Sequence, residues 1–173
     1  IQRHEAAQSA LRRAGRAQPE QLLLTADRPR LADAVDRLLA LGPQRRPTAI
    51  FAVEEAWPII HLLSKRGIAV PGRISVLGLG SWETWGDALD GLHTIEHGRG
   101  ADDPADLQQL ARLLPEQLKK LSLSYVHLPA GPMGQWAFTE AQRRLADPTD
   151  GPAHQMFRPS LKLGNTTAPP VAQ

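Results

Sequence analysis

Two short apolar runs separated by one helical pattern are the feature that most constrains the fold of this chain. The runs are residues 47–53 (PTAIFAV) and 73–79 (RISVLGL). Continuous apolar runs of this length are typical of parallel strands that are covered on both faces. Residues 55–66 read as a helix, because Pro58 is tolerated in a first turn and Gly67 can end the last one. This alternation predicts right-handed βαβ units, and therefore an α/β fold with a parallel, doubly wound sheet.

The rest of the chain continues the alternation with one interruption. We expect helices up to Gly15, over 28–41 and over 129–146, and strands over 22–25, 123–128 and 154–163. Residues 83–122 break the rhythm, since glycines make their first part loop-like and a leucine stripe follows within 102–121.

Composition excludes several classes of function. The 20 Lys and Arg residues against 18 Asp and Glu residues give a net charge of only +2, which argues against this segment gripping nucleic acid by itself. The chain has no cysteine, which excludes disulfides, thiolate chemistry and Cys-ligated metals, and which fits a cytoplasmic protein. No apolar run is long enough to span a bilayer. The chain begins inside a helical pattern without an initiator Met, so we expect a fragment whose amino-terminal part is missing.

The motifs that would indicate an enzyme are incomplete. The GLG of residues 78–80 lacks the third glycine of a dinucleotide-binding fingerprint, because Glu83 stands there. Ser81 lacks the flanking glycines of a nucleophile elbow. His93 and His97 are four residues apart but lie in a glycine-rich stretch, which favours two solvated loop histidines over a metal pair. We therefore expect no catalytic residue, no metal and no cofactor.

Two features follow the ends of the predicted strands, where open α/β sheets bind ligands. Glu54 is either a helix cap or a ligand contact, whereas a cap is the better interpretation for Glu55. Trp82 and Trp85 either fill a local core or offer an aromatic platform to a ligand. The sequence leaves both questions open.

The block RPTAIFAVEEAWPIIHLLSKRGIAVPGRISVLGLGS, residues 46–81, resembles the LacI/GalR (lactose/galactose repressor) family of bacterial transcription regulators. That family typically reads PTAIFAxND…A…LxxxGxxVPxDISVxGFDD. The likeness is weaker at RHEAAQSALRRAG, at LSYVHLPAGPMGQWAFTEAQRRLADP and at RPSLKLGNTTAPP. It spans nearly the whole chain except about residues 83–122, which would be an inserted helical segment.

The resemblance implies a type I periplasmic-binding-protein-like fold with two lobes and an effector between them. Residues 1–127 and 152–173 would form the carboxyl-terminal lobe, and residues 128–151 would cross to the amino-terminal lobe. The apolar residues of the helix at 132–146 would then be left exposed in this chain. They are Met133, Trp136, Ala137, Phe138, Ala141 and Leu145.

The resemblance also places the effector contacts. The family's effector-contacting Arg falls on Arg3, its Asn on Glu54, its first Asp of GFDD on Gly80 and its Gln on Leu128. Three polar contacts suited to sugar hydroxyls or purine edges are thus changed or lost. Stacking of a sugar or heterocycle on Trp82 or Trp85 is a plausible substitute, and we favour Trp82 for the ligand and Trp85 for packing against residues 83–122. The expected ligand-binding residues are Arg3, Glu54, Gly80, Ser81, Trp82 and Leu128.

The function that we expect is that of a non-enzymatic effector-binding module of a cytoplasmic regulator, which would contact DNA through a domain absent from this chain. The alternative is a periplasmic solute-binding protein, which shares the fold, and an enzyme comes third. The helix at 55–66 is apolar on more than one face, which indicates a second buried surface. In the family the equivalent helix packs between subunits, so we expect a homodimer through Trp57, Ile59 and Leu63.

Overall fold

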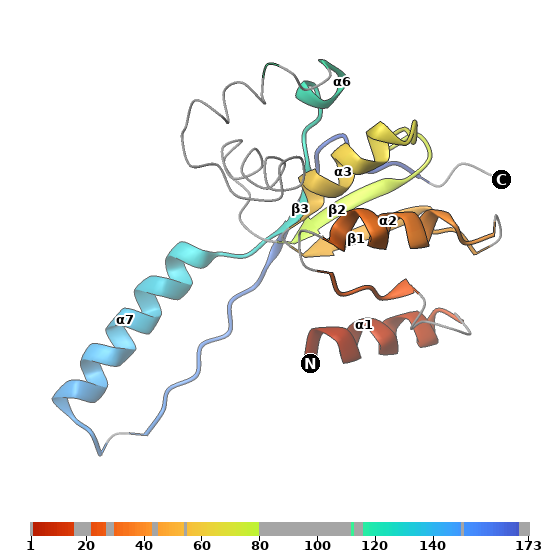
Figure 1. The fold of residues 1–173 in the computed structure, drawn as a ribbon. Helices are drawn as coiled ribbons and strands as arrows, with labels where there is room; N and C mark the ends of the chain where they lie inside the picture. Colours follow the sequence, from red (N-terminus) through yellow and green to blue (C-terminus); the bar gives the residue numbers. More distant parts are fainter. Residues whose placement is uncertain are drawn as a thin grey trace.

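The computed structural model describes residues 2–15, 22–26, 30–42, 45–53, 55–79, 112, 116–149 and 151–169. Its centre is a four-stranded sheet in the order β1-β2-β3-β4 (Figure 1). The strands are β1 Ala49–Val53, β2 Ser75–Leu79, β3 Ser124–His127 and β4 Ser160–Lys162. The first three strands are parallel and β4 runs antiparallel to β3. The predicted α/β fold class, with a sheet in which parallel pairing dominates, is confirmed.

Five helices are described: α1 Gln2–Arg13, α2 Leu31–Leu39, α3 Ala56–Lys65, α6 Glu116–Lys119 and α7 Ala130–Ala146. None of the helices in the described part of the chain has the length and apolarity that crossing a bilayer requires. The predicted helix over 102–121 lies mostly outside the described residues, and α6 is the part of it that can be followed as a helical run.

The core forms where α3 packs on one face of the sheet. Ile60, Leu63 and Val76 are fully buried there. The close approach depends on Gly78 of β2, since a Cβ at this position would lie 3.4 Å from the Cβ of Ala56 and 3.1 Å from a methyl group of Leu123. The helix therefore rests directly on the backbone of the central strand.

An ion pair joins α3 to the neighbouring helix α2. The guanidinium of Arg66, just after α3, donates two hydrogen bonds to the carboxylate of Asp36 in α2, one of them 2.7 Å from Nη2 to Oδ2. These hydrogen bonds lower the pKa of Asp36 below its ordinary value. The pair links the two helices at the surface, and Leu31 and Val35 complete the core from α2.

The opposite face of the sheet is open at β1. Along this strand Ala52 is buried, whereas Phe51 is 55% exposed and Val53 is 39% exposed. The expectation that the run 47–53 is covered on both faces is therefore wrong in this structure. The run predicts the strand, but not the number of layers that pack on it.

The carboxyl-terminal segment completes the sheet where β2 and β3 begin. Thr166 is buried, and its hydroxyl accepts a hydrogen bond from Ser124 N and donates one to Val76 O, each at 2.8 Å. Ser75 exchanges two hydrogen bonds with the backbone of Ala168. The side-chain amide of Asn165 accepts a hydrogen bond from Ser122 N and donates one to Lys120 O. The segment thus ties the starts of two strands together.

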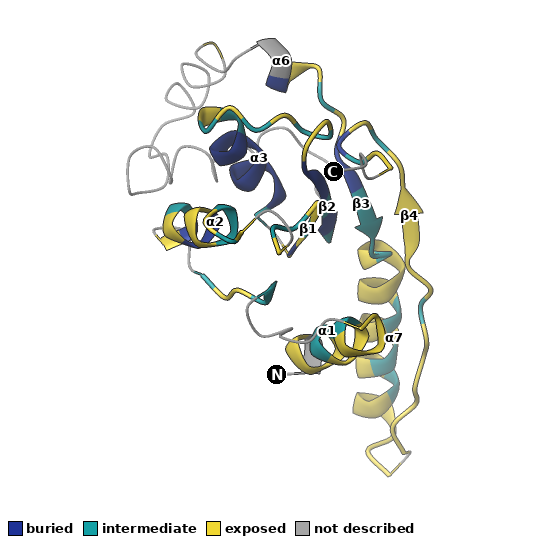
Figure 2. Ribbon diagram, turned by 90° about the vertical axis from the view of Figure 1, so that its right-hand side faces the viewer, coloured by how far each residue is buried: buried dark blue, intermediate teal, exposed yellow. Residues whose placement is uncertain are grey.

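Helix α7 projects from the sheet as an arm, with residues 151–159 returning beside it (Figures 1 and 2). None of its residues is buried, and Phe138 is 65% and Leu145 84% exposed. The prediction that this helix is left exposed by its own chain is confirmed. Trp136 is half-buried, because its ring contacts Phe157 of the returning segment edge-to-face at 6.2 Å.

Two predicted strands differ from the structure. Residues 22–26 are described and contain no strand, so the strand expected at 22–25 is wrong. The strand expected over 154–163 is confined to β4, because residues 151–159 run along α7 rather than along β3. Apolar composition alone could not show which neighbour each segment would take.

Candidate functional site

The carboxyl ends of the three parallel strands meet at one edge of the sheet. The register pairs Val53 with Leu79 and Leu79 with Val126. The residues that follow in sequence are Glu54 after β1, Gly80 after β2 and His127 at the end of β3. Neighbouring strands lie about 4.8 Å apart, so these three positions span roughly 10 Å. Open α/β sheets bind ligands at this edge.

The structure tests the predicted contacts only in part. Leu128 is described and half-buried, immediately after β3. The side chain of Arg3 lies outside the described residues, and so do Glu54, Gly80, Ser81, Trp82 and Trp85. The register brings the strand ends before Glu54 and Gly80 to the same edge as Leu128. The roles of these six residues and of Trp85 stay predictions.

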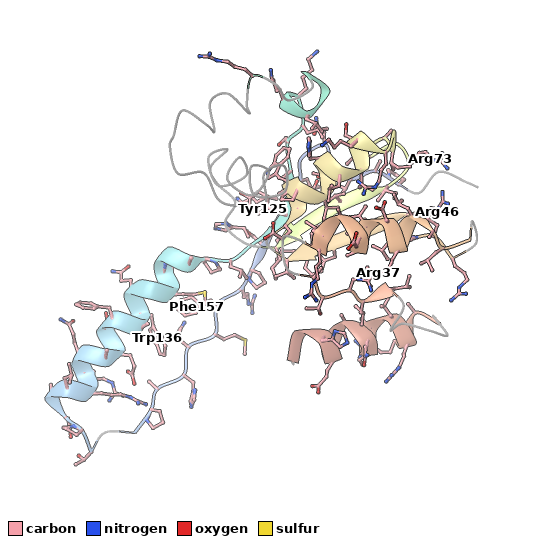
Figure 3. All side chains as sticks on the ribbon, viewed as in Figure 1. Arg37, Arg46, Arg73, Tyr125, Trp136 and Phe157 are labelled. Atoms are coloured by element: carbon pink, nitrogen blue, oxygen red, sulfur yellow. The ribbon has the colours of Figure 1, made fainter. Side chains whose placement is uncertain are left out.

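His127 is a polar residue at this edge that the sequence reasoning did not select. It is half-buried at the end of β3, and its ring stands edge-on to the ring of Tyr125 at 6.2 Å between centroids. Tyr125 lies on the face of the sheet that α3 covers, and is labelled in Figure 3. The available signal was an ionisable residue in the last position of an apolar strand, which is where a doubly wound sheet presents side chains to a ligand.

Glu55 occupies the capping position that the sequence predicts, but not in the predicted manner. It is the N-cap residue of α3, and its side chain makes no capping hydrogen bond. The residue is half-buried, and the carboxylate oxygen Oε2 is enclosed. A carboxylate near a helix amino terminus is favoured by the helix dipole without a direct cap.

The pairing of β3 with β4 stops abruptly at the edge of the sheet that carries the candidate site. The last ladder pair is His127 with Ser160. Pro129 and Pro159 stand just beyond it, and proline has no N–H to extend a ladder. Leu128 O accepts a hydrogen bond from Ala130 N at 2.7 Å as the chain turns into α7. β3 and β4 therefore connect the predicted site directly to the arm.

The residues predicted for the dimer interface are covered within their own chain. Trp57 and Ile59 are each 8% exposed, and Leu63 is fully buried. A second subunit could reach them only with a rearrangement of the groups that cover them. Dimerisation through this helix stays a prediction.

No group of three or more His, Cys, Asp or Glu side chains is arranged to hold a metal ion within the described ranges. His93 and His97 lie outside those ranges.

Comparisons with known proteins give relatives of this fold. A search of curated proteins finds no match. One similar solved structure is a LacI family transcriptional regulator from Lactobacillus casei with bound sucrose. It has 21% sequence identity and a TM-score of 0.50, over 89% of this chain and 48% of that chain. A LacI regulator from Lactobacillus casei with bound Tris gives 21% identity and a TM-score of 0.50, over 92% of this chain and 49% of that one. The chain thus spans about half the length of these regulators.

The family itself is shown by a sequence model. The model described as "Periplasmic binding protein-like domain" matches residues 1–90, which is more than half of the 173 residues. These residues include β1, α3 and β2, the elements that deliver two of the three strand ends to the candidate site. The predicted resemblance is confirmed at this level, and the chain belongs to the periplasmic binding protein-like domain family.

Proposed function

We propose that this chain is an effector-binding module of a transcription regulator, and that the effector binds at the carboxyl ends of β1, β2 and β3. The observation that carries the proposal is the family match over residues 1–90, combined with similar regulator structures that hold sucrose or Tris. The register supports the position of the site, since it aligns the ends of the three strands.

The proposed ligand is a small polyhydroxylated molecule that stacks on Trp82. An aromatic face suits the apolar side of a sugar ring, and such stacking replaces part of the binding that Gly80 and Leu128 cannot supply through polar side chains. Arg3, Glu54 and Ser81 would provide polar contacts. His127 adds a ring nitrogen at the same edge.

The proposed module closes its site with a second lobe, to which residues 128–151 belong. The exposed apolar side of α7 supports this assignment, because an uncovered aromatic-rich helix is unfavourable in water. Ligand binding would then favour one angle between the lobes. The output would reach DNA through a domain outside this chain, in a cytoplasmic homodimer that uses the helix of Trp57, Ile59 and Leu63.

The first test is ligand binding by the full-length protein. Sucrose and a panel of monosaccharides would be titrated by calorimetry against the wild type, Trp82→Ala and the control Trp85→Ala. Stacking is worth about 1 kcal/mol, so Trp82→Ala should weaken binding by about fivefold or more, while Trp85→Ala should not. Equal affinities, or a Trp82→Ala protein that no longer folds, would remove Trp82 from the site.

The second test separates a regulator from a solute-binding protein. Full-length protein that binds a specific duplex DNA, and changes its affinity when the sugar is added, supports the regulator. Protein that binds the sugar without any DNA response supports the solute-binding alternative. Sedimentation at micromolar concentration would test the homodimer, and a monomer would contradict it.

A further inference from the structure

An arginine cluster lies at the edge of the sheet opposite the candidate site. Arg46 stands three residues before β1 and Arg73 two residues before β2. The register pairs Ala49 with Ser75, so the two arginines precede neighbouring strands at nearly the same level. Figure 3 shows Arg46 and Arg73 on the same side of the molecule. Arg45 and Arg37, from the last turn of α2, belong to the same edge.

Arg46 and Arg73 have no anionic partner in the described part of the chain. The Nε atom of Arg46 is buried and makes no hydrogen bond there. The acidic side chain closest in sequence to Arg37, Asp36, is already occupied by two hydrogen bonds from Arg66. Arg73 is exposed, so its guanidinium can donate to an anion from outside the chain.

A purely structural role accounts for only part of the cluster. Arg37 is at the carboxyl-terminal end of α2, where the helix dipole favours a cation. Arg46 and Arg73 lie in no helix and therefore complement no helix end of their own. Their shared position calls for a different explanation.

We propose that Arg37, Arg45, Arg46 and Arg73 form a surface that binds the phosphate backbone of nucleic acid without sequence preference. The guanidinium fork matches phosphate geometry. The contacts extend from a helix end across the starts of two strands, which suits an extended polyanion better than one small anion. The exposed aromatic side chains of the described residues, Phe51 and Phe138, lie farther along β1 and on α7. Protein partners are usually anchored on such aromatic groups, so the observations favour nucleic acid over an acidic protein.

This surface does not depend on the proposed effector site, because it occupies the amino ends of the strands whereas the effector would bind at their carboxyl ends. Binding to it should therefore be unaffected by a ligand at the other edge.

The test measures how the affinity for a duplex DNA of random sequence depends on salt. Each phosphate contact contributes about 0.9 to the slope of log K against log salt concentration. Arg46→Gln/Arg73→Gln should lower the slope by about 2. The control Arg12→Gln/Arg158→Gln makes the same charge change at exposed residues of α1 and the returning segment, and should leave the slope unchanged.

Three results would overturn the proposal. These are no measurable DNA binding at low salt, an equal drop in slope for both double variants, or tighter binding of a polyglutamate peptide than of DNA. Circular dichroism would verify folding. If the double variant fails to fold, the exposed Arg73→Gln alone should still lower the slope by about 0.9.

Discussion

Gly164 shows how much one missing side chain can matter. A Cβ at this position would overlap the backbone carbonyl group of Ser122 and lie 2.7 Å from Leu123 O. Backbone cannot move aside as a side chain can, so we expect Gly164→Ala to lower the free energy of unfolding by about 1–3 kcal/mol in urea denaturation. Gly151→Ala is the control, because a Cβ there meets nothing within 4 Å. Equal stability of the two variants would contradict this account.

Thr166 is the residue on which the carboxyl-terminal segment depends. Thr166→Val preserves its shape but leaves Ser124 N and Val76 O without their buried partner. Each lost partner costs about 1–3 kcal/mol, so the urea concentration at the midpoint of unfolding should fall clearly. Thr166→Ser keeps the hydroxyl and should lose less than Thr166→Val. The opposite order would mean that the methyl group, rather than the hydrogen bonds, stabilises the segment.

The candidate site was only partly predictable from its residues. The end of the apolar run at 47–53 is visible in the sequence, so Glu54 could be selected from the pattern as a possible ligand contact. Gly80 and Leu128 were predicted only from the resemblance to the LacI/GalR family. His127 could not be selected in this way, because a single histidine at the end of a strand matches no motif. The sequence pattern places Glu55 at the N-cap of α3, but it cannot show whether the side chain makes the capping hydrogen bond.

At the scale of elements, α3, α7 and β1 to β3 could be placed within about two residues, since each has a strong apolar period or run. The prediction of a short strand at 22–25 was wrong, because three leucines and a threonine do not determine a pairing partner. The prediction that β1 is covered on both faces was wrong for a related reason. An apolar run shows that a strand favours burial, whereas the number of layers depends on segments distant in sequence.

The arm contains an ionic junction with a defined pH dependence. Glu140 accepts hydrogen bonds from Arg143, Arg144 and Ala153 N, and these lower its pKa from 4.5 to about 2, with Arg143 the largest cause. Because the folded-state pKa is depressed, this stabilisation is complete above about pH 4.5 and is lost as the pH falls towards 2. The protection of the backbone amides of residues 151–157 against hydrogen exchange, measured relative to their intrinsic exchange rates, should therefore fall over that interval.

A matched pair of variants separates this junction from general acid unfolding. Glu140→Gln should speed exchange of residues 151–157 at pH 7 and remove their acid-dependent step, while exchange in β2 is unchanged. Glu5→Gln, on the exposed side of α1, should do neither. If Glu140→Gln exchanges like the wild type, Trp136 and Phe157 hold the returning segment without the carboxylate.

For the whole molecule, total charge is a poor guide to its distribution. A net charge of +2 predicts no binding to nucleic acid. However, this sum adds the positive charges at one edge of the sheet to the negative charges of acidic residues elsewhere in the chain. Parallel βαβ topology makes such segregation possible, because the starts of all parallel strands and the ends of their preceding helices meet at one edge. Only the register shows that Arg46 and Arg73 are neighbours.

The exposed side of the arm makes a prediction for the whole chain. Phe138 and Leu145 contribute little to folding within the 173 residues, because most of each side chain is in water. Phe138→Ser/Leu145→Ser should therefore change the free energy of unfolding by no more than about 0.5 kcal/mol. It should also weaken self-association in concentration-dependent sedimentation, because an apolar helix face favours contact between copies. Met156→Ser, at an exposed residue outside α7, should leave association unchanged. A fall in stability instead would show that α7 packs within its own chain, and would remove the reason for assigning it to a second lobe.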